Sequence, residues 1–163
     1  MRRVVLTMLL ACMSGEAAAA EEAKELPPCP GAYNRATWTN CTGDVTLASG
    51  HTYIGGFQDG KYSGQGTFTA PDGQIYVGEY KDGTPNGHGT HRFRTGEKYI
   101  GAFRDGRYNG HGTFTFGDRR KYVGDYKDGR PHGHGMEYRA DGAVQRSGVW
   151  ENGVFLPAGL HTP

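Results

Sequence analysis

Residues 53–75 read YIGGFQDGKYSGQGTFTAPDGQI, and residues 76–98 read YVGEYKDGTPNGHGTHRFRTGEK. Both stretches open with Tyr-x-Gly-x-aromatic, continue through Asp-Gly, and then carry Gly-x-Gly. The same order returns in residues 99–121 and 122–144, so the leading tyrosine recurs at one constant interval. A fixed period of this kind is the sequence signature of a repeat architecture.

Each unit is predicted to form a β-hairpin. Tyr-x-Gly-x-aromatic alternates with a period of two, so its three side chains share one face of a strand. Asp-Gly favours a turn because glycine reaches positive φ without steric cost, and Gly-x-Gly opens the returning strand. Glycine normally weakens a strand. Here we expect both glycines to make room for an aromatic ring from the neighbouring strand.

The composition agrees with an aromatic core. The chain of 163 residues is long enough for one domain. It holds 28 glycines, 10 tyrosines and 7 phenylalanines, whereas aliphatic residues are scarce outside the first dozen positions. The glycines have no three-residue period, which excludes collagen.

The four units resemble the MORN (membrane occupation and recognition nexus) repeat in their Tyr-x-Gly-x-aromatic, Asp-Gly and Gly-x-Gly elements. The resemblance implies an all-β fold, an elongated single-layer antiparallel meander of tandem 23-residue β-hairpins. The four repeats are residues 53–75, 76–98, 99–121 and 122–144.

Weaker copies flank the array. Residues 21–52 are expected to form an N-terminal cap that contains half a repeat, with Cys41 where the first glycine of Gly-x-Gly belongs. Residues 145–163 are expected to form a partial fifth repeat and a C-terminal cap, in which Arg146 replaces the leading tyrosine after one inserted residue. Terminal repeats are atypical because they end the stack.

Some positions depart from the pattern. Arg119 stands where the other repeats close with glycine, so we expect its turn to differ. His91 and Glu137 occupy the position of Phe68 and Phe114. A longer period is also present: repeats one and three place tyrosine after the Asp-Gly turn, and repeats two and four place proline. The array therefore resembles a duplicated 46-residue pair.

Residues 1–20 have the pattern of an export signal, with two arginines, a short apolar run and an alanine tract. Cleavage before Glu21 is one interpretation. The other is a lipoprotein box at Leu9–Cys12, with Cys12 lipidated. Both place the protein outside the cytoplasm, in the periplasm or attached to the envelope.

Cys29 and Cys41 remain as an even pair, and a disulfide between them suits an oxidising compartment. Closing a loop of this length stabilises a fold by about 3 kcal/mol. Without residues 1–20 the basic and acidic residues balance, so no global attraction to nucleic acid is expected.

The aromatic rows are the main candidate binding surface, for a peptide, a lipid or a glycan. The alternative is that these rings only pack on one another and form the core. The candidate residues are Tyr53, Phe57, Tyr76, Tyr80, Tyr99, Phe103, Tyr122 and Tyr126.

Metal, cofactor and catalytic sites are not predicted. His88, His111 and His134 recur once per repeat, which spaces them roughly 10 Å apart, whereas donors to one zinc ion lie about 3–4 Å from each other. His132 could share a face with His134, but two histidines without a third donor make a weak site. The chain has neither Gly-x-Ser-x-Gly nor His-Glu-x-x-His.

Arg119, Arg120 and Lys121 form the one local basic cluster of the repeats and could contact anionic lipid, although a solvated turn is the simpler interpretation. The sequence thus predicts a non-catalytic envelope scaffold whose sheet binds another protein, with self-association as one option. Membrane phospholipid is the alternative partner. Cell-wall glycan ranks last, because sugar platforms favour tryptophan and the chain has only Trp38 and Trp150.

Overall fold

The computed structural model describes residues 25–157. The export signal expected in residues 1–20, with its lipidation site at Cys12, and the end of the C-terminal cap from residue 158 lie outside the described residues.

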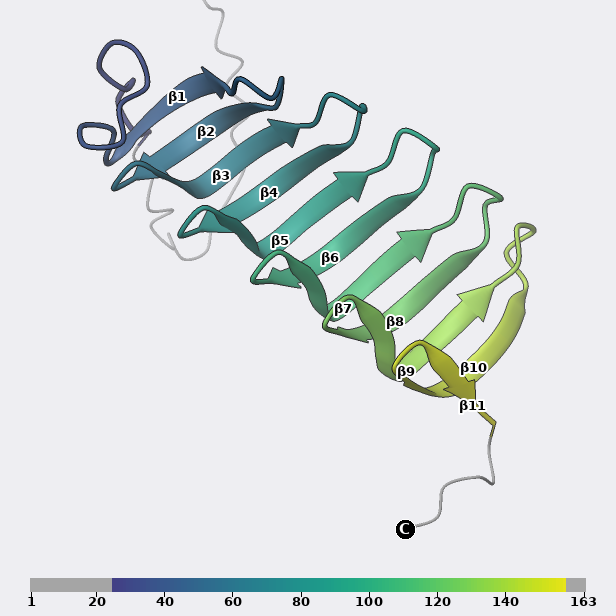
Figure 1. Ribbon diagram of the computed structural model, residues 1–163. Coiled ribbons are helices and arrows are strands. Elements are labelled where there is room, and N and C mark those ends of the chain that lie inside the picture. Colours follow the sequence, from purple (N-terminus) through teal and green to yellow (C-terminus); the bar gives the residue numbers. More distant parts are fainter. Residues whose placement is uncertain (1–24, 158–163) are drawn as a thin grey trace, which may run out of the picture.

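The described chain is a single antiparallel sheet in which every strand pairs with its neighbours in sequence, from β1 at one edge to β11 at the other (Figure 1). This confirms the predicted all-β hairpin meander. In Figure 1 the strands β3, β5, β7 and β9 run in nearly the same direction, so the sheet is long and rotates little. The strands are β1 Cys41–Thr46, β2 Thr52–Gln58, β3 Lys61–Thr69, β4 Ile75–Lys81, β5 Thr84–Arg92, β6 Lys98–Arg104, β7 Arg107–Thr115, β8 Lys121–Lys127, β9 Arg130–Tyr138, β10 Val144–Glu151 and β11 Val154–Leu156.

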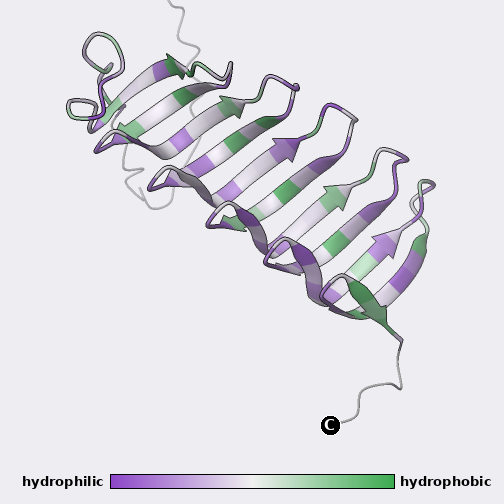
Figure 2. Ribbon diagram, viewed as in Figure 1, coloured by the Kyte–Doolittle hydropathy of each residue, from purple (hydrophilic) through white to green (hydrophobic). Residues whose placement is uncertain are grey.

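Hydropathy alternates along the strands. Figure 2 shows short hydrophobic segments between pale and hydrophilic ones, which is the pattern of a sheet with one strongly apolar face. The Asp-Gly pairs form the hairpin turns with positive φ at both positions, as at Asp59 (φ 50°) and Gly60 (φ 67°). Positive φ at both central residues marks the turn that matches the natural twist of a hairpin.

A row of glycines crosses the sheet, one from each strand from β1 to β10. Each glycine lies opposite the next in the strand register. The row consists of Gly43, Gly55, Gly66, Gly78, Gly89, Gly101, Gly112, Gly124, Gly135 and Gly148.

The two glycines of Gly-x-Gly have different roles, which refines the expectation that both make room. At the second, Gly89, an added Cβ would lie 2.6 Å from Cζ of Tyr76, so this glycine makes space for the tyrosine ring. The first, Gly87, has φ +104° and allows Asn86–His88 to bulge opposite Glu79. The first glycine is therefore needed for backbone conformation and the second for packing.

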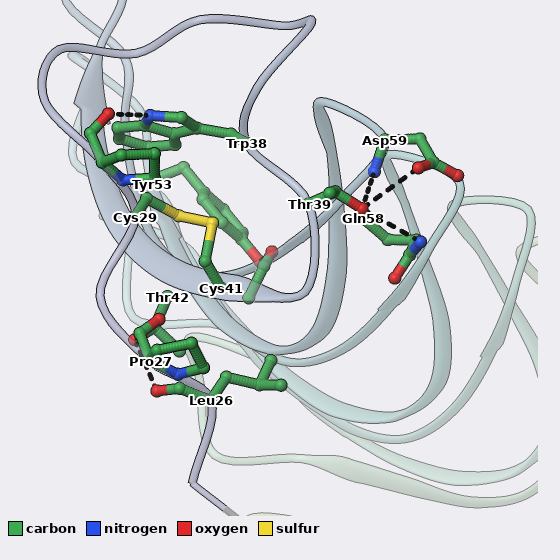
Figure 3. Close-up of a disulfide and its surroundings, with 12 residues drawn as sticks. Leu26, Pro27, Cys29, Trp38, Thr39, Cys41, Thr42, Tyr53, Gln58 and Asp59 are labelled. Carbon is green, nitrogen blue, oxygen red and sulfur yellow. Dashed lines mark hydrogen bonds between the residues drawn. A yellow bond between two sulfur atoms is a disulfide. The ribbon is translucent and has the colours of Figure 1, made fainter.

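The N-terminal cap is held by a disulfide between Cys29 and Cys41, as predicted (Figure 3). Backbone bonds join Cys29 N–H to Thr42 O and Thr42 N–H to Pro27 O, so this segment covers part of the β1 edge. Trp38 is buried and lies over Gly43, where an added Cβ would be 2.7 Å from the indole ring. The cap thus closes the sheet with an indole where the repeats use tyrosine.

The turn that contains Arg119 does not differ in its hydrogen bonds. Phe116 N–H donates to Arg120 O and Arg119 N–H donates to Phe116 O, the same two bonds that the glycine-containing turns make. Arg119 adopts φ +70° to keep this geometry. An L-residue with a side chain is strained there.

Candidate binding surfaces

One side of the sheet, here called the ring face, carries the eight aromatic residues that the sequence singled out. All eight are buried, with exposed fractions between 0 and 6 %. Their rings meet edge to face, as between Tyr53 and Phe57 at 5.3 Å and between Tyr76 and Phe103 at 4.8 Å. These rings form the core, and they leave little of their own surface for a partner.

Each leading tyrosine crosses the glycine row and bonds to a carbonyl three residues ahead. Tyr53 Oη donates to Gly56 O at 3.0 Å and Tyr99 Oη donates to Ala102 O at 3.0 Å. The accepting residue in each repeat is the one opposite the bulge. The tyrosine hydroxyl therefore satisfies a carbonyl group at the place where the strand ladder is interrupted.

Burial affects the acidity of these phenols. It raises the pKa of Tyr76, Tyr108 and Tyr122 to about 12, and it raises the pKa of Tyr80 and Tyr126 further. The cause is desolvation, which penalises the phenolate. These tyrosines are neutral structural residues at physiological pH.

The 46-residue period has a structural basis. Tyr62 stacks on Tyr53 and Tyr108 stacks on Tyr99, each with ring centroids 3.7 Å apart. Pro85 takes the corresponding register position in repeat two, opposite Tyr80. Repeats one and three thus cover the leading tyrosine with a second ring, whereas repeats two and four carry proline at this place.

A hollow of about 270 Å³ lies on the ring face beside Pro85. His91 closes one side of it and its Nδ1 lies 3.0 Å from Tyr108 Oη. Burial lowers the pKa of His91, and Asp72 opposes this shift. The other residues that line the hollow are Tyr62, Phe68, Tyr76, Tyr80, Gly83, Phe103 and Gly106.

Glu137 and Arg146, which depart from the repeat pattern, are partners. Arg146 Nε lies 3.1 Å from Glu137 Oε2, and Arg120 Nη1 lies 3.3 Å from Glu137 Oε1. Glu137 is 6 % exposed, so two guanidinium groups compensate a buried carboxylate at the C-terminal end of the ring face. The sequence showed both substitutions, but not that they meet.

The opposite side of the sheet, here called the open face, presents three parallel rows of side chains. The central row, here called the aliphatic row, alternates isoleucine or valine with threonine across consecutive strands and ends at Met136 on β9. Ile54 is 61 % exposed, Val77 46 % and Ile100 47 %. The register aligns the aliphatic row as Ile54, Thr67, Val77, Thr90, Ile100, Thr113, Val123 and Met136.

The two rows that flank the aliphatic row carry opposite charges. The basic row holds Arg92, Lys98 and Lys121 and contains no carboxylate. The acidic row holds Glu79 and Asp125 and contains no lysine or arginine. Histidines lie beside both acids: His88 Nδ1 is 3.8 Å from Glu79 Oε1 and His111 Nδ1 is 3.3 Å from Asp125 Oδ1.

The predicted basic cluster is divided between the two faces. Arg120 pairs with Asp118 at 2.7 Å and lies over the Phe116 ring on the ring face. Arg119 and Lys121 instead line a hollow of about 300 Å³ with Arg139, together with Val123, Tyr138, Ala140 and Gly142. Arg120 therefore does not belong to the cationic surface that its neighbours form.

Several other features bear on function. Trp38 and Trp150 are both buried and present no open platform for a sugar. Among residues 25–157, no group of three or more histidines, cysteines or carboxylates is placed to hold a metal ion. Over the same range, no helix has the length and apolar character needed to cross a membrane.

A comparison with family models finds the MORN repeat at residues 53–75, 76–98, 99–119 and 122–144. These matches cover more than half of the chain, so the protein belongs to the MORN repeat family. MORN repeats are typically non-catalytic modules that bind membranes or proteins. A comparison with curated proteins gives no match.

The aliphatic row is the feature that sequence reasoning missed. Its signal is the residue after each leading tyrosine, which is Ile54, Val77, Ile100 and Val123 in turn. These residues recur with the same period as the tyrosines. Alternation along the strand places their side chains on the face opposite the rings.

Proposed function

We propose that the protein is a non-catalytic exported scaffold that binds another protein through its open face. The observation that carries this proposal is the aliphatic row, which runs from β2 to β9 and in which Ile54, Val77 and Ile100 are exposed. The ring face supplies the core by itself, so the sheet does not need these side chains for its own packing.

A row of exposed aliphatic residues separated only by threonine favours a macromolecular partner. Single exposed apolar residues are normal on a protein surface, whereas contiguous ones mark interaction sites. The row spans eight strands, or roughly 35–40 Å at the usual strand spacing. This length exceeds a small ligand and suits the surface of a protein.

The Cys29–Cys41 disulfide supports an exported location, because disulfides persist in oxidising compartments. The export signal proposed for residues 1–20 agrees with it. A periplasmic or envelope-attached scaffold follows from the two together, with cleavage before Glu21 or lipidation at Cys12 as the alternative forms.

The experiment places a photo-crosslinking amino acid at Ile100 and, as the matched control, at Ala48 in an exposed turn. Irradiation of cells that export the protein should give a discrete protein adduct from position 100 and none from position 48. Equal adducts at both positions, or no protein adduct at position 100, would refute binding through the open face.

A second candidate function is binding of anionic lipid, favoured by the hollow between Arg119, Lys121 and Arg139. Each basic residue near an anionic membrane contributes about 1 kcal/mol. The variant R119E/R139E should then lose binding to vesicles that contain phosphatidylglycerol. The matched variant R35E/R130E makes the same charge change at two exposed arginines outside this hollow and should bind them like the wild type.

A further inference from the structure

Strand β8 carries one residue from each row of the open face. Lys121 belongs to the basic row, Val123 to the aliphatic row and Asp125 to the acidic row. They are spaced two residues apart, so the cation and the carboxylate lie about 6.5–7 Å on either side of the aliphatic row.

This arrangement is self-complementary under one particular symmetry. A two-fold axis along the aliphatic row places the open face of a second copy against the open face of the first. The basic row of each copy then lies opposite the acidic row of the other. Lys121 of one subunit then faces Asp125 of the other, and the reverse contact forms at the same time. A two-fold axis parallel to the strands would instead place one basic row on the other.

The cations of the basic row are available for such contacts. Arg92, Lys98 and Lys121 form no ion pair within the part of the chain that the structure describes. Arg92 lies on β5, beside the strand that carries Glu79, so the same rotation brings Arg92 near the partner's acidic row as well.

The size of the face suits a stable dimer. The three rows run across the eight strands from β2 to β9 for roughly 35–40 Å and cover a width of roughly 15–20 Å. The resulting area of about 500–800 Å² per subunit approaches the roughly 800 Å² that each partner buries in a standard protein interface.

We infer that the partner of the open face is a second copy of this chain, packed face to face about a two-fold axis that runs along the aliphatic row. This inference rests on the proposed scaffold function and names its partner. The aliphatic rows meet on the axis, and the Lys121–Asp125 pairs set the orientation of the two sheets.

The test is a charge exchange in the disulfide-bonded protein, with self-association measured by sedimentation equilibrium. K121E and D125K should each weaken self-association about tenfold or more, because each variant alone creates two like-charge contacts across the axis. The double variant K121E/D125K should recover the affinity of the wild type. R35E, which makes the same charge change as K121E but outside the three rows, should leave it unchanged.

Mixing the two single variants gives the decisive result. In a mixed dimer the K121E change faces the D125K change, and the unchanged Asp125 faces the unchanged Lys121. Native mass spectrometry of an equimolar mixture should therefore show the mixed dimer in excess over both homodimers. A statistical mixture, or a wild type that stays monomeric at millimolar concentration, overturns the inference.

The cross-link at position 100 separates this inference from the scaffold function. An adduct with a different protein would overturn self-pairing and leave the scaffold function standing. The absence of any protein adduct at position 100 would overturn both.

Discussion

The space over the glycine row is filled by the leading tyrosines, and Gly112→Ala tests whether the fold tolerates a side chain there. An added Cβ at Gly112 would lie 2.6 Å from both Cε2 and Cζ of Tyr99. The Tyr99 ring cannot shift to relieve this contact. It is fully buried, stacked on Tyr108 at 3.7 Å and held edge-on by Phe103 at 5.2 Å and Tyr126 at 5.1 Å.

Displacing Tyr99 removes three kinds of stabilising interaction. It loses the burial of a large side chain, worth about 1.5–3 kcal/mol, and the ring contacts, worth about 0.5–1.5 kcal/mol per pair. It also leaves Ala102 O without its hydroxyl donor, at about 1–3 kcal/mol. These losses overlap, and we expect Gly112→Ala to cost about 3–5 kcal/mol, as removal of a buried aromatic side chain does.

The assay is urea unfolding followed by far-ultraviolet circular dichroism. Gly117→Ala is the matched control, because an added Cβ there meets only Thr95 O at 3.4 Å and the residue has no positive φ. The control should stay within about 0.5 kcal/mol of the wild type. If Gly112→Ala lowers the free energy of unfolding by less than about 1 kcal/mol relative to Gly117→Ala, the glycine row is not what positions the rings.

Four further outcomes are expected. Arg119→Gly should raise the free energy of unfolding by about 1 kcal/mol, because it relieves a positive φ in a side-chain-bearing residue; no gain in urea unfolding would contradict this. The buried tyrosines keep their protons in the folded state at a pH near 10, where the unfolded state loses them. The free energy of unfolding should therefore fall as the pH rises above about 10. The absorbance of tyrosinate and the loss of sheet should then appear in one step, and gradual ionisation with an intact sheet would be inconsistent with burial. Burial lowers the pKa of His91 in the folded state, so its contribution to stability is complete above the ordinary histidine pKa of about 6.5 and is lost as the pH falls below it. The gain in unfolding midpoint from His91→Phe should therefore be larger near pH 5 than near pH 8. Reduction of Cys29–Cys41 should lower the free energy of unfolding by about 3 kcal/mol, and an unchanged midpoint in reductant would show that the cap holds without it.

Much of the fold could be predicted from the sequence because the period of the repeat determines three structural features. The constant interval between leading tyrosines set the strand register, the face of each ring and the position of each turn. The glycines showed that rings would cover bare backbone, and the structure places Tyr76 over Gly89 in this way. The period did not reveal that the first glycine of each pair serves a bulge, because a bulge is defined by the strand opposite.

The binding surfaces were harder to predict because they depend on cross-strand neighbours. Arg119, Arg120 and Lys121 are adjacent in sequence, yet alternation along the strand directs Arg120 and Lys121 to opposite faces. Arg139, which joins the cationic hollow, comes from the next turn of the array. The pairing of Glu137 with Arg146 was hidden for the same reason, since each was visible only as an exception to its own repeat.

Every strand pairs only with its neighbours in sequence, and the ring contacts reach no further than the next repeat, so no contact in the described sheet fixes the number of hairpins. The alternation of tyrosine and proline after the Asp-Gly turn does limit how many repeats can be gained or lost at once. Loss or gain of a pair of repeats preserves the order of the two kinds. Loss or gain of a single repeat would either place two of the same kind side by side or change the kind that lies next to a cap. Each paired step adds or removes four strands, or roughly 19 Å of sheet. The length of the sheet can therefore change in evolution by fixed increments while both of its ends stay the same.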